Sequence, residues 1–385
     1  MKFLRFWLVF PLILGLMLAI AYLPLPIQPY LDFQALYHAN LGVLHAIPLY
    51  DLTGQVTMIA ELAGVTPDKV LLLPFVYPPW YSLLTLPLAL LPIDVAARLW
   101  FELNLFIVMA FVWLMTETWP ARRRLISFLF AILFLPVLGA LIVGQFVFPV
   151  LLGGGILVYA LPRERVWLTA CALILLTFKP HIGGLALLAG LVYLMLRWNA
   201  FARRTLWVTG IVAIFLFVSS FLVDRNWLVR YFETLFEFRK ISPCGELCVS
   251  LPMAITSLFA INSSFAIWLG GILLLSWAGW FIRTSPAALK DVSWLISVTF
   301  CITLLASPYQ YNYDFVVLLL PLLVLASRVH AQRDWLWLAI VYSLPWIGLI
   351  FGRHGNLVLL VSTFGLIYLL WLKARPSQDF LDVHL

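Results

Sequence analysis

Charged side chains are scarce in this chain. They make up 11% of its 385 residues, whereas ordinary soluble domains contain about 25%. The 24 basic and 17 acidic residues are too few to coat a soluble protein of this length, and 64% of all residues are hydrophobic. An ordinary soluble globular domain is therefore excluded.

Several motifs of soluble enzymes are also missing. The sequence contains no P-loop, no glycine-rich dinucleotide turn, no GxSxG or HExxH motif and no cysteine pattern that binds a metal. A nucleotide-driven pump or a cytoplasmic enzyme therefore has no support. We expect neither a cofactor nor a metal site.

Apolar runs are what the sequence has in abundance. Runs of about 18–25 apolar residues are typical of transmembrane helices, and helices satisfy every backbone polar group inside lipid. The 17 Trp and 14 Tyr residues cluster near the ends of the runs, as interfacial belts do. The candidate runs are 6–27, 71–92, 95–117, 125–143, 146–161, 166–178, 182–196, 206–223, 264–282, 292–307, 314–326, 335–351 and 356–372.

The distribution of basic residues predicts the topology. If every run crossed the membrane, residues 122–124 and the later basic clusters would face outward, against the positive-inside rule. The run 71–92 contains five prolines, which break helix hydrogen bonding, so we interpret it as re-entrant or interfacial. About 12 spans then remain, both termini are cytoplasmic, and 16 of the 24 Lys and Arg residues lie inside. Because these residues sit in short loops, the net charge of +7 does not indicate a nucleic-acid partner.

The sequence therefore predicts an all-α polytopic membrane protein, with one transmembrane domain over residues 1–385, in the plasma or inner membrane. Two long segments, about 28–94 and 224–263, face outward, and every cytoplasmic loop is short. We therefore expect the function on the extracytoplasmic side. The apolar stretch that ends near Ile27 is long for a signal peptide, so we expect an uncleaved first span.

The first outer segment carries candidate site residues. Asp32 is suited to act as a general base, which must lie near an acceptor hydroxyl, and its alternative role is to cap the helix that follows. Tyr37 and His38 are candidate substrate contacts or interfacial packing residues, and Asp51 is expected to cap a helix. Tyr77, in a Pro-rich segment, is a candidate contact for a sugar or a lipid chain, or a membrane anchor.

More candidates lie at the predicted outer ends of spans. Lys179 and His181 are suited to binding a lipid phosphate, although Lys179 is alternatively a lysine that snorkels to the interface. Arg98 is a further phosphate candidate, and its spacing to Glu102 equally permits a structural ion pair. Gln145 lies at another span end as a candidate substrate contact.

The turn 307–314 is dense in hydroxyl and amide groups. Its Tyr311 and Asn312 are candidate sugar contacts, with interface packing as the alternative. In the second outer segment, Cys244 and Cys248 lie close together and predict a small disulfide ring, with two free thiols as the alternative. Cys171 and Cys301 lie inside apolar runs, where we expect buried, inert thiols.

The order of these motifs resembles a known family. Along the chain they are Asp32-Phe33 with Tyr37, Pro48-Leu49-Tyr50-Asp51, Tyr77-Pro78-Pro79, Leu86-Pro87-Leu88-Ala89, Leu91-Pro92, Trp100, Gly144-Gln145, Lys179-Pro180 and Ser307-Pro308. Over about residues 1–320 the chain resembles glycosyltransferase family 87, the polyprenyl-phosphate-mannose-dependent mannosyltransferases of GT-C fold. The resemblance implies Asp32 as catalytic base, juxtamembrane helices in the first outer loop, a dolichyl- or polyprenyl-phosphate sugar as donor, and no metal. Relatives often carry a histidine where this chain has Tyr311-Asn312-Tyr313.

The leading hypothesis is an inverting transferase that moves mannose, or another hexose or pentose, from a polyprenyl-phosphate donor to a lipid or glycan acceptor. Lys179, Arg98 and His181 would bind the donor phosphate, and membrane lipids would surround the protein. A lipid or solute transporter or flippase is the main rival, and it predicts midplane charges and internal repeats. Ionisable residues lie mostly at run ends, and no repeat is visible. A non-catalytic glycan-assembly protein is the third hypothesis.

Overall fold

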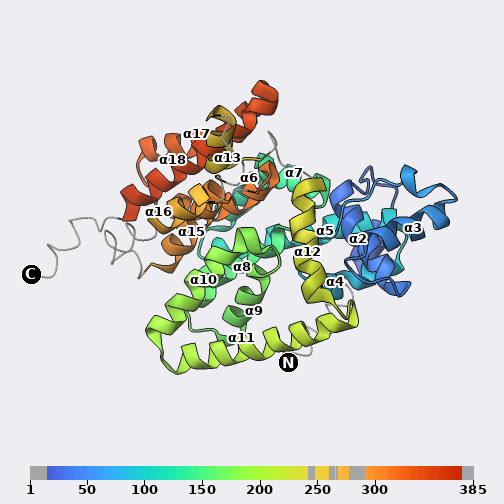
Figure 1. The fold of residues 1–385 in the computed structure, drawn as a ribbon. Coiled ribbons are helices and arrows are strands. Elements are labelled where there is room, and N and C mark those ends of the chain that lie inside the picture. Colours follow the sequence, from blue (N-terminus) through green and yellow to red (C-terminus); the bar gives the residue numbers. More distant parts are fainter. Residues whose placement is uncertain are drawn as a thin grey trace, which may run out of the picture. The chain divides into compact units, whose positions relative to one another are not determined.

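The computed structural model describes residues 15–241, 248–259, 265, 268–276, 291–307 and 309–374. Every regular element within these residues is a helix, and they contain no strand (Figure 1). The predicted all-helical class is therefore confirmed. The described chain divides into two compact units, the first within 1–107, 140–145 and 213–243, the second within 108–139, 146–212 and 244–385.

The first unit is built mainly from short helices. They are α2 (Leu31–Leu44), α3 (Leu52–Ala63), η1 (Pro67–Lys69), α4 (Pro79–Thr85), η2 (Leu86–Leu90), η3 (Ser220–Leu222) and α12 (Trp227–Ile241), with the first part of α5 (Ile93–Met115). The run 71–92 holds only α4 and η2, which are seven and five residues long. A membrane span needs about 20 helical residues, so neither of these helices spans a membrane.

Local sequence explains where these helices begin and end. The Asp51 side chain accepts a hydrogen bond from the Gly54 backbone N–H at 3.0 Å, so the predicted cap at the start of α3 is confirmed. Gly64 ends α3 with a φ of 64°, a conformation that glycine adopts without strain. Pro79 occupies the first position of α4, where its missing N–H costs nothing.

A buried polar triad joins α2 to α4. The Asn40 side chain is fully buried, and its Nδ2 donates to Thr85 Oγ1 at 3.1 Å, while its Oδ1 accepts from Ser82 Oγ at 2.5 Å. Buried amide groups without partners are costly, and here both ends of the amide are satisfied. The triad therefore fixes α4 against α2 within the first unit.

The second unit contains the longer helices. They are the rest of α5, α6 (Ala121–Leu133), α8 (Phe148–Ala160), α9 (Val166–Leu176), α10 (Pro180–Arg197), α13 (Leu251–Phe259), α15 (Val292–Ala306), η6 (Asn312–Leu318), α16 (Leu319–Arg328), α17 (Gln332–Gly348), η7 (Leu349–Gly355) and α18 (Asn356–Ala374). Two further helices, α7 (Leu135–Val143) and α11 (Ala200–Ser219), contribute to both units. Among these elements, α17 and α18 run side by side (Figure 1).

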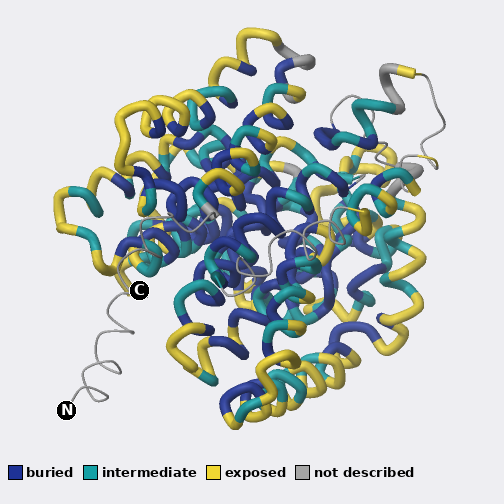
Figure 2. The backbone as a smooth tube through the Cα atoms, turned by 90° about the vertical axis from the view of Figure 1, so that its left-hand side faces the viewer, coloured by how far each residue is buried: buried dark blue, intermediate teal, exposed yellow. Residues whose placement is uncertain are grey.

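Glycines allow close packing at the centre of the second unit. A Cβ on Gly155 of α8 would lie 2.5 Å from Phe111 Cδ2, a distance that no real side chain tolerates. The rings of Phe111, Phe300 and Phe315 are almost fully buried. Figure 2 shows such buried stretches beside exposed ones along the same helices. Exposed apolar residues are frequent on α11, where Trp207 is 74% and Phe215 68% exposed, as expected of a helix that faces lipid.

The predicted count of about 12 spans is not confirmed. Among the described residues, four helices are long and apolar enough to cross a membrane, or up to five if the bent pair α6–α7 counts as one. Further apolar helices, such as Val166–Leu176, are shorter. One predicted run, 125–143, contains a broken helix: α6 and α7 meet at 60° near Phe134, two residues before Pro136. Several long apolar helices nevertheless indicate a membrane protein.

Candidate active site

Asp32 lies in the first turn of α2, with a partly buried side chain. The N-cap position belongs to Tyr30, so the alternative role of Asp32 as helix cap is wrong. A negatively charged side chain in a first turn is favoured by the positive end of the helix dipole. The start of the helix is further held by Gln34, whose Nε2 donates to the Pro29 carbonyl at 2.7 Å.

Phe33, which follows Asp32 in the chain, packs against Gly144, whose backbone is left-handed. Gly144 has a φ of 72°, and a Cβ on it would lie 2.9 Å from Phe33 Cβ. The Trp100 indole N–H donates to the Gly144 carbonyl at 2.9 Å. The predicted contact Gln145 follows directly and is fully buried. The Gly144-Gln145 motif therefore positions the first turn of α2 by close backbone approach.

Tyr37 and His38 are adjacent in space as well as in sequence, with ring centroids 5.4 Å apart. The Tyr37 hydroxyl donates to the Leu91 carbonyl at 2.8 Å, which ties α2 to the end of the Pro-rich segment. His38 Nδ1 is buried and has no hydrogen-bond partner among the described residues. Burial lowers the pKa of His38 to about 4, so the ring is neutral at pH 7.

Tyr77 belongs to a row of aromatic rings in the first unit. The Tyr50 hydroxyl donates to the Tyr77 carbonyl at 2.7 Å. Ring contacts continue from Tyr231 through Tyr50, Phe75 and Tyr77 to Tyr81, with centroids 5.6–6.1 Å apart. Tyr77 itself is 8% exposed. Its ring therefore packs inside this row, and such pairs stabilise the fold beyond the area that they bury.

Arg98 and Glu102 do not form the ion pair that their spacing permits, as far as the described residues extend. The Arg98 Nη1 atom donates to the Ala21 carbonyl at 3.2 Å instead. Arg98 Nε and Glu102 Oε1 are both buried, and neither has a hydrogen-bond partner within the part of the chain that the structure describes. The buried Nε N–H of Arg98 is thus a donor that no described residue satisfies.

Lys179 is paired with a carboxylate that lies far along the chain. Its Nζ atom lies 2.5 Å from Asp314 Oδ1, with side chains 4% and 1% exposed. Burial excludes the alternative of a snorkelling lysine. His181 Nε2 lies 4.0 Å from Asp314 Oδ2, and the His181 side chain is 38% exposed. These three residues therefore form one cluster in which His181 is the group that faces outward.

The turn before Asp314 presents a ladder of tyrosines. The Tyr311 and Tyr313 rings stack with centroids 5.2 Å apart, and the Tyr309 and Tyr311 hydroxyls lie 3.3 Å apart. The Lys179 ammonium lies 5.1 Å from the centroid of the Tyr313 ring, within the range of a cation–π contact. Asp314 Oδ2 accepts the Tyr311 backbone N–H at 3.0 Å. The cluster and the tyrosine turn thus hold each other in place.

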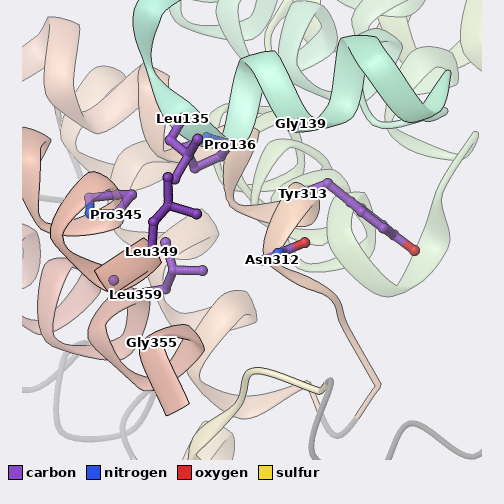
Figure 3. A pocket seen from close by; sticks show the side chains of 10 residues that line it. Leu135, Pro136, Gly139, Asn312, Tyr313, Pro345, Leu349, Gly355 and Leu359 are labelled. Carbon is purple, nitrogen blue, oxygen red and sulfur yellow. The ribbon is translucent and has the colours of Figure 1, made fainter. Parts of the chain in front are cut away.

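A cleft of about 280 Å³ adjoins this turn. Asn312 and Tyr313 line one side, and Leu135, Leu349 and Leu359 lie on the other (Figure 3). The cleft opens where α7 begins after its bend and where α17 passes into η7, so breaks in two helices create the space. Of the two predicted sugar contacts, Asn312 lines the cleft, while Tyr311 packs in the tyrosine ladder.

The segment after Cys248 is anchored to the same turn. Gln310 is fully buried. Its side-chain Nε2 donates to the Val249 carbonyl at 2.5 Å, and its backbone carbonyl accepts from Val249 N–H at 3.0 Å.

Cys248 is disulfide-bonded, whereas Cys244 lies outside the described residues, so the pairing of these two stays a prediction. Cys171 and Cys301 are free; Cys301 is buried as expected, but Cys171 is exposed, so the expectation of a buried thiol is wrong there.

A comparison with protein-family models decides the family. The model of glycosyltransferase family 87 matches residues 75–308, more than half of the chain. The chain belongs to glycosyltransferase family 87. No curated protein and no solved structure matches it. The resemblance read from the motifs is confirmed, and the chain is a membrane glycosyltransferase.

The family match covers only part of the candidate site. It includes Tyr77, Arg98, Gln145, Lys179 and His181. Asp32, Tyr37, His38, Tyr311 and Asn312 lie outside the matched range, so their roles in this family 87 glycosyltransferase rest on their own geometry. Among the described residues, no group of three His, Cys, Asp or Glu side chains is arranged to hold a metal ion.

Sequence reasoning placed two residues of the second unit in the turn 307–314, and named Asp314 only as a fallback base, without choosing either as a site residue. Asp314, the partner of Lys179, and Tyr313, which lines the cleft, both follow the predicted contacts Tyr311 and Asn312 directly. An acidic residue next to an apolar run is a signal that points to Asp314, since a lone carboxylate at the end of a span needs a cation. Nothing in the local sequence identifies Lys179 as that cation.

Proposed function

We propose that this family 87 glycosyltransferase transfers a sugar, mannose or another hexose or pentose, from a polyprenyl-phosphate donor to a lipid or glycan acceptor. The observation that carries the proposal is the family membership over residues 75–308, together with a partly buried carboxylate, Asp32, in a first helical turn. The long apolar helices of the described chain suit an enzyme whose donor is itself a membrane lipid.

The proposed reaction is an inverting displacement. The Asp32 carboxylate accepts the proton of the acceptor hydroxyl while that oxygen attacks the anomeric carbon of the donor sugar. The bond between the anomeric carbon and the phosphate oxygen breaks on the opposite face, and polyprenyl phosphate leaves with the bonding electron pair. A base at this position contributes about 10²–10⁴-fold to the rate. The first-turn position supports this role because the positive end of the helix dipole favours a negative charge there.

The donor phosphate is proposed to bind beside the Lys179, His181 and Asp314 cluster. The Lys179 ammonium is already paired, so the half-exposed His181 makes the direct contact and Lys179 contributes charge from behind it. The adjoining cleft has an amide at one side and leucines at the other, which suits a sugar-phosphate end and a prenyl chain respectively. Arg98 is a second candidate for the phosphate because its Nε donor has no partner among the described residues.

The protein is proposed to adopt the GT-C architecture and to work on the extracytoplasmic face of the plasma or inner membrane, with both termini cytoplasmic. The support is the positive-inside rule, since 16 of the 24 basic residues fall on the cytoplasmic side in this topology. Cysteine-accessibility labelling tests it: Arg123→Cys is expected to react only from the cytoplasmic side, and Thr57→Cys only from outside.

The decisive experiment measures sugar transfer by the purified protein. Radiolabelled polyprenyl-phosphate sugars are incubated with membrane lipids as acceptors, and glycolipid product is compared with released polyprenyl phosphate. Wild type is expected to yield both in equal amounts. Asp32→Asn is expected to lose about 10²–10⁴-fold in turnover with an unchanged melting temperature. Asp94→Asn is the matched control, because Asp94 is also a first-turn carboxylate, on α5, and is exposed. Normal turnover by folded Asp32→Asn would exclude Asp32 as base, and no transfer from any such donor would overturn the proposal.

A further inference from the structure

A second apolar slot lies in the second unit, between α6, α16 and α17. Its volume is about 320 Å³, and its walls include Ile126, Phe130, Leu322, Leu338 and Tyr342. It shares no lining residue with the cleft beside Asn312 and Tyr313. The Tyr342 hydroxyl donates to the Phe130 carbonyl at 2.9 Å, which holds α17 against α6 at one end of the slot.

An arginine occupies the other end of the slot. The Arg123 guanidinium lies 4.0 Å from the centroid of the Trp119 ring and 5.7 Å from that of Trp335. Its Nη2 atom donates to the Ala326 carbonyl at 2.5 Å. Two rings and one carbonyl thus fix the guanidinium in place while its other N–H groups remain for a ligand. All four residues line the slot.

The surroundings of Arg123 carry an excess of positive charge. Arg122 and Arg333 are exposed, and no ion pair joins Arg122, Arg123 or Arg333 to an acidic residue within the described part of the chain. The acidic residues nearby in sequence are already paired. These pairs are Glu117 with Arg163 and Asp334 with Lys373. The open end of the slot therefore favours an anion.

The dimensions and the tryptophans fit a membrane lipid. The eight residue steps from Arg123 to Ala131 span about 12 Å of helix, close to the roughly 15 Å depth of one leaflet. Trp119 and Trp335 flank the charged end, as interfacial tryptophans do at the level of lipid headgroups. An apolar slot under a fixed cation thus matches one acyl chain below a phosphate.

We propose that this slot binds an anionic glycerophospholipid of the surrounding bilayer, with its phosphate on Arg123 and one acyl chain between α6 and α17. The site is distinct from the proposed donor site and does not depend on the transferase reaction. Positive-inside topology assigns the arginines to the cytoplasmic leaflet, which is rich in anionic lipids.

Native mass spectrometry of the full chain in nanodiscs of equal phosphatidylglycerol and phosphatidylcholine tests the proposal. Wild type is expected to retain phosphatidylglycerol at least about fivefold over phosphatidylcholine, and Arg123→Gln to lower that preference by about fivefold. Arg122→Gln is the matched control, because Arg122 carries the same charge in the same cluster, is exposed and does not line the slot. Equal loss in both variants indicates a general surface charge effect and overturns the site.

A second variant keeps the proposal testable if Arg123→Gln does not fold. Ala339 lines the slot and is exposed, so Ala339→Phe is expected to fill the slot without disturbing the core. It should reduce retained phosphatidylglycerol at least about threefold and abolish the rise in melting temperature that this lipid gives the wild type. Wild-type retention by folded Ala339→Phe, or equal retention of the two lipids by the wild type, would contradict the proposal.

Discussion

Lys179 and Asp314 are 135 positions apart in the sequence, yet their Nζ and Oδ1 atoms lie 2.5 Å apart in the interior of the second unit. The pair joins the start of α10 to the turn that lines the cleft. Because both side chains are almost fully buried, each charge depends on the other, and removal of one leaves an uncompensated charge in a medium of low dielectric constant. This dependence leads to the first prediction.

Lys179→Met alone is expected to destabilise the protein by about 3–5 kcal/mol, because the Asp314 carboxylate loses its cation. The double variant Lys179→Met with Asp314→Asn should recover most of the loss, since Asn can still accept the Tyr311 N–H. Thermal unfolding of the single and double variants measures both effects. A single variant that melts like the wild type would show that the pair does not stabilise the fold.

The same variants separate structure from donor binding. If Lys179 also supports the donor phosphate, the double variant should fold normally but need at least about tenfold more donor for half-maximal transfer, with acceptor dependence unchanged. A folded double variant with wild-type donor dependence would restrict Lys179 to a structural role. His181 would then be the remaining phosphate candidate in this cluster.

Gly144→Ala is expected to disturb the position of Asp32. The new Cβ would meet Phe33 at 2.9 Å, and the φ of 72° strains any residue other than glycine. We expect a loss of about 1–3 kcal/mol in stability and a larger fractional loss in turnover than in donor affinity. Gly210→Ala is the control, since a Cβ there meets nothing within 4 Å. If the two variants have equal turnover, Phe33 does not position the first turn of α2.

Some of this architecture was predictable from sequence, and the reasons are local. The scarcity of charge predicts membrane helices, and the turn that ends at Asp51 predicts its cap, because both depend on residues within a few positions of one another. The ordered motifs predict the family. The prolines of 71–92 correctly predict that no long helix forms there.

The rest depends on contacts that sequence spacing does not contain. Arg98 and Glu102 lie one turn apart, but Arg98 donates to the Ala21 carbonyl instead. The partner of Lys179 could not be chosen from the sequence, because several acidic residues lie at equally large separations. Hydropathy likewise predicts one span for 125–143, but the backbone bends by 60° inside it, since Pro136 cannot donate to the helix ladder.

His38 is expected to make the protein less stable at acidic pH. Its pKa in the folded state, about 4, lies below the ordinary value of 6.5, so the unfolded chain binds a proton first. The contribution of His38 to the free energy of unfolding is therefore fully present above pH 6.5 and is lost as the pH drops towards 4. Because a pKa difference of one corresponds to about 1.4 kcal/mol, the loss is at most about 3.5 kcal/mol.

Melting temperatures of the wild type and His38→Phe between pH 7.5 and 4.5 measure this effect. Phenylalanine fills the same space without a titrating nitrogen, so the difference between the two proteins should widen as the pH falls. Parallel curves would mean that His38 is protonated as easily in the folded protein as in the unfolded chain. The pH dependence would then have to come from other groups.

The cleft beside Asn312 and Tyr313 gives the last prediction. Gly139 lines this cleft, and a Cβ on it would meet nothing within 4 Å, so Gly139→Phe should project a ring into the space without a clash. If the prenyl chain of the donor lies there, the variant should require at least about tenfold more long-chain donor for half-maximal transfer. Maximal turnover and melting temperature should change little, because neither Asp32 nor the Lys179 pair is touched. Gly184→Phe on α10 is the control, since that position is equally open but does not line the cleft. Transfer is measured with donors of long and short prenyl chains, and the defect should shrink as the chain shortens. Equal donor dependence of Gly139→Phe and Gly184→Phe would mean that the prenyl chain binds elsewhere.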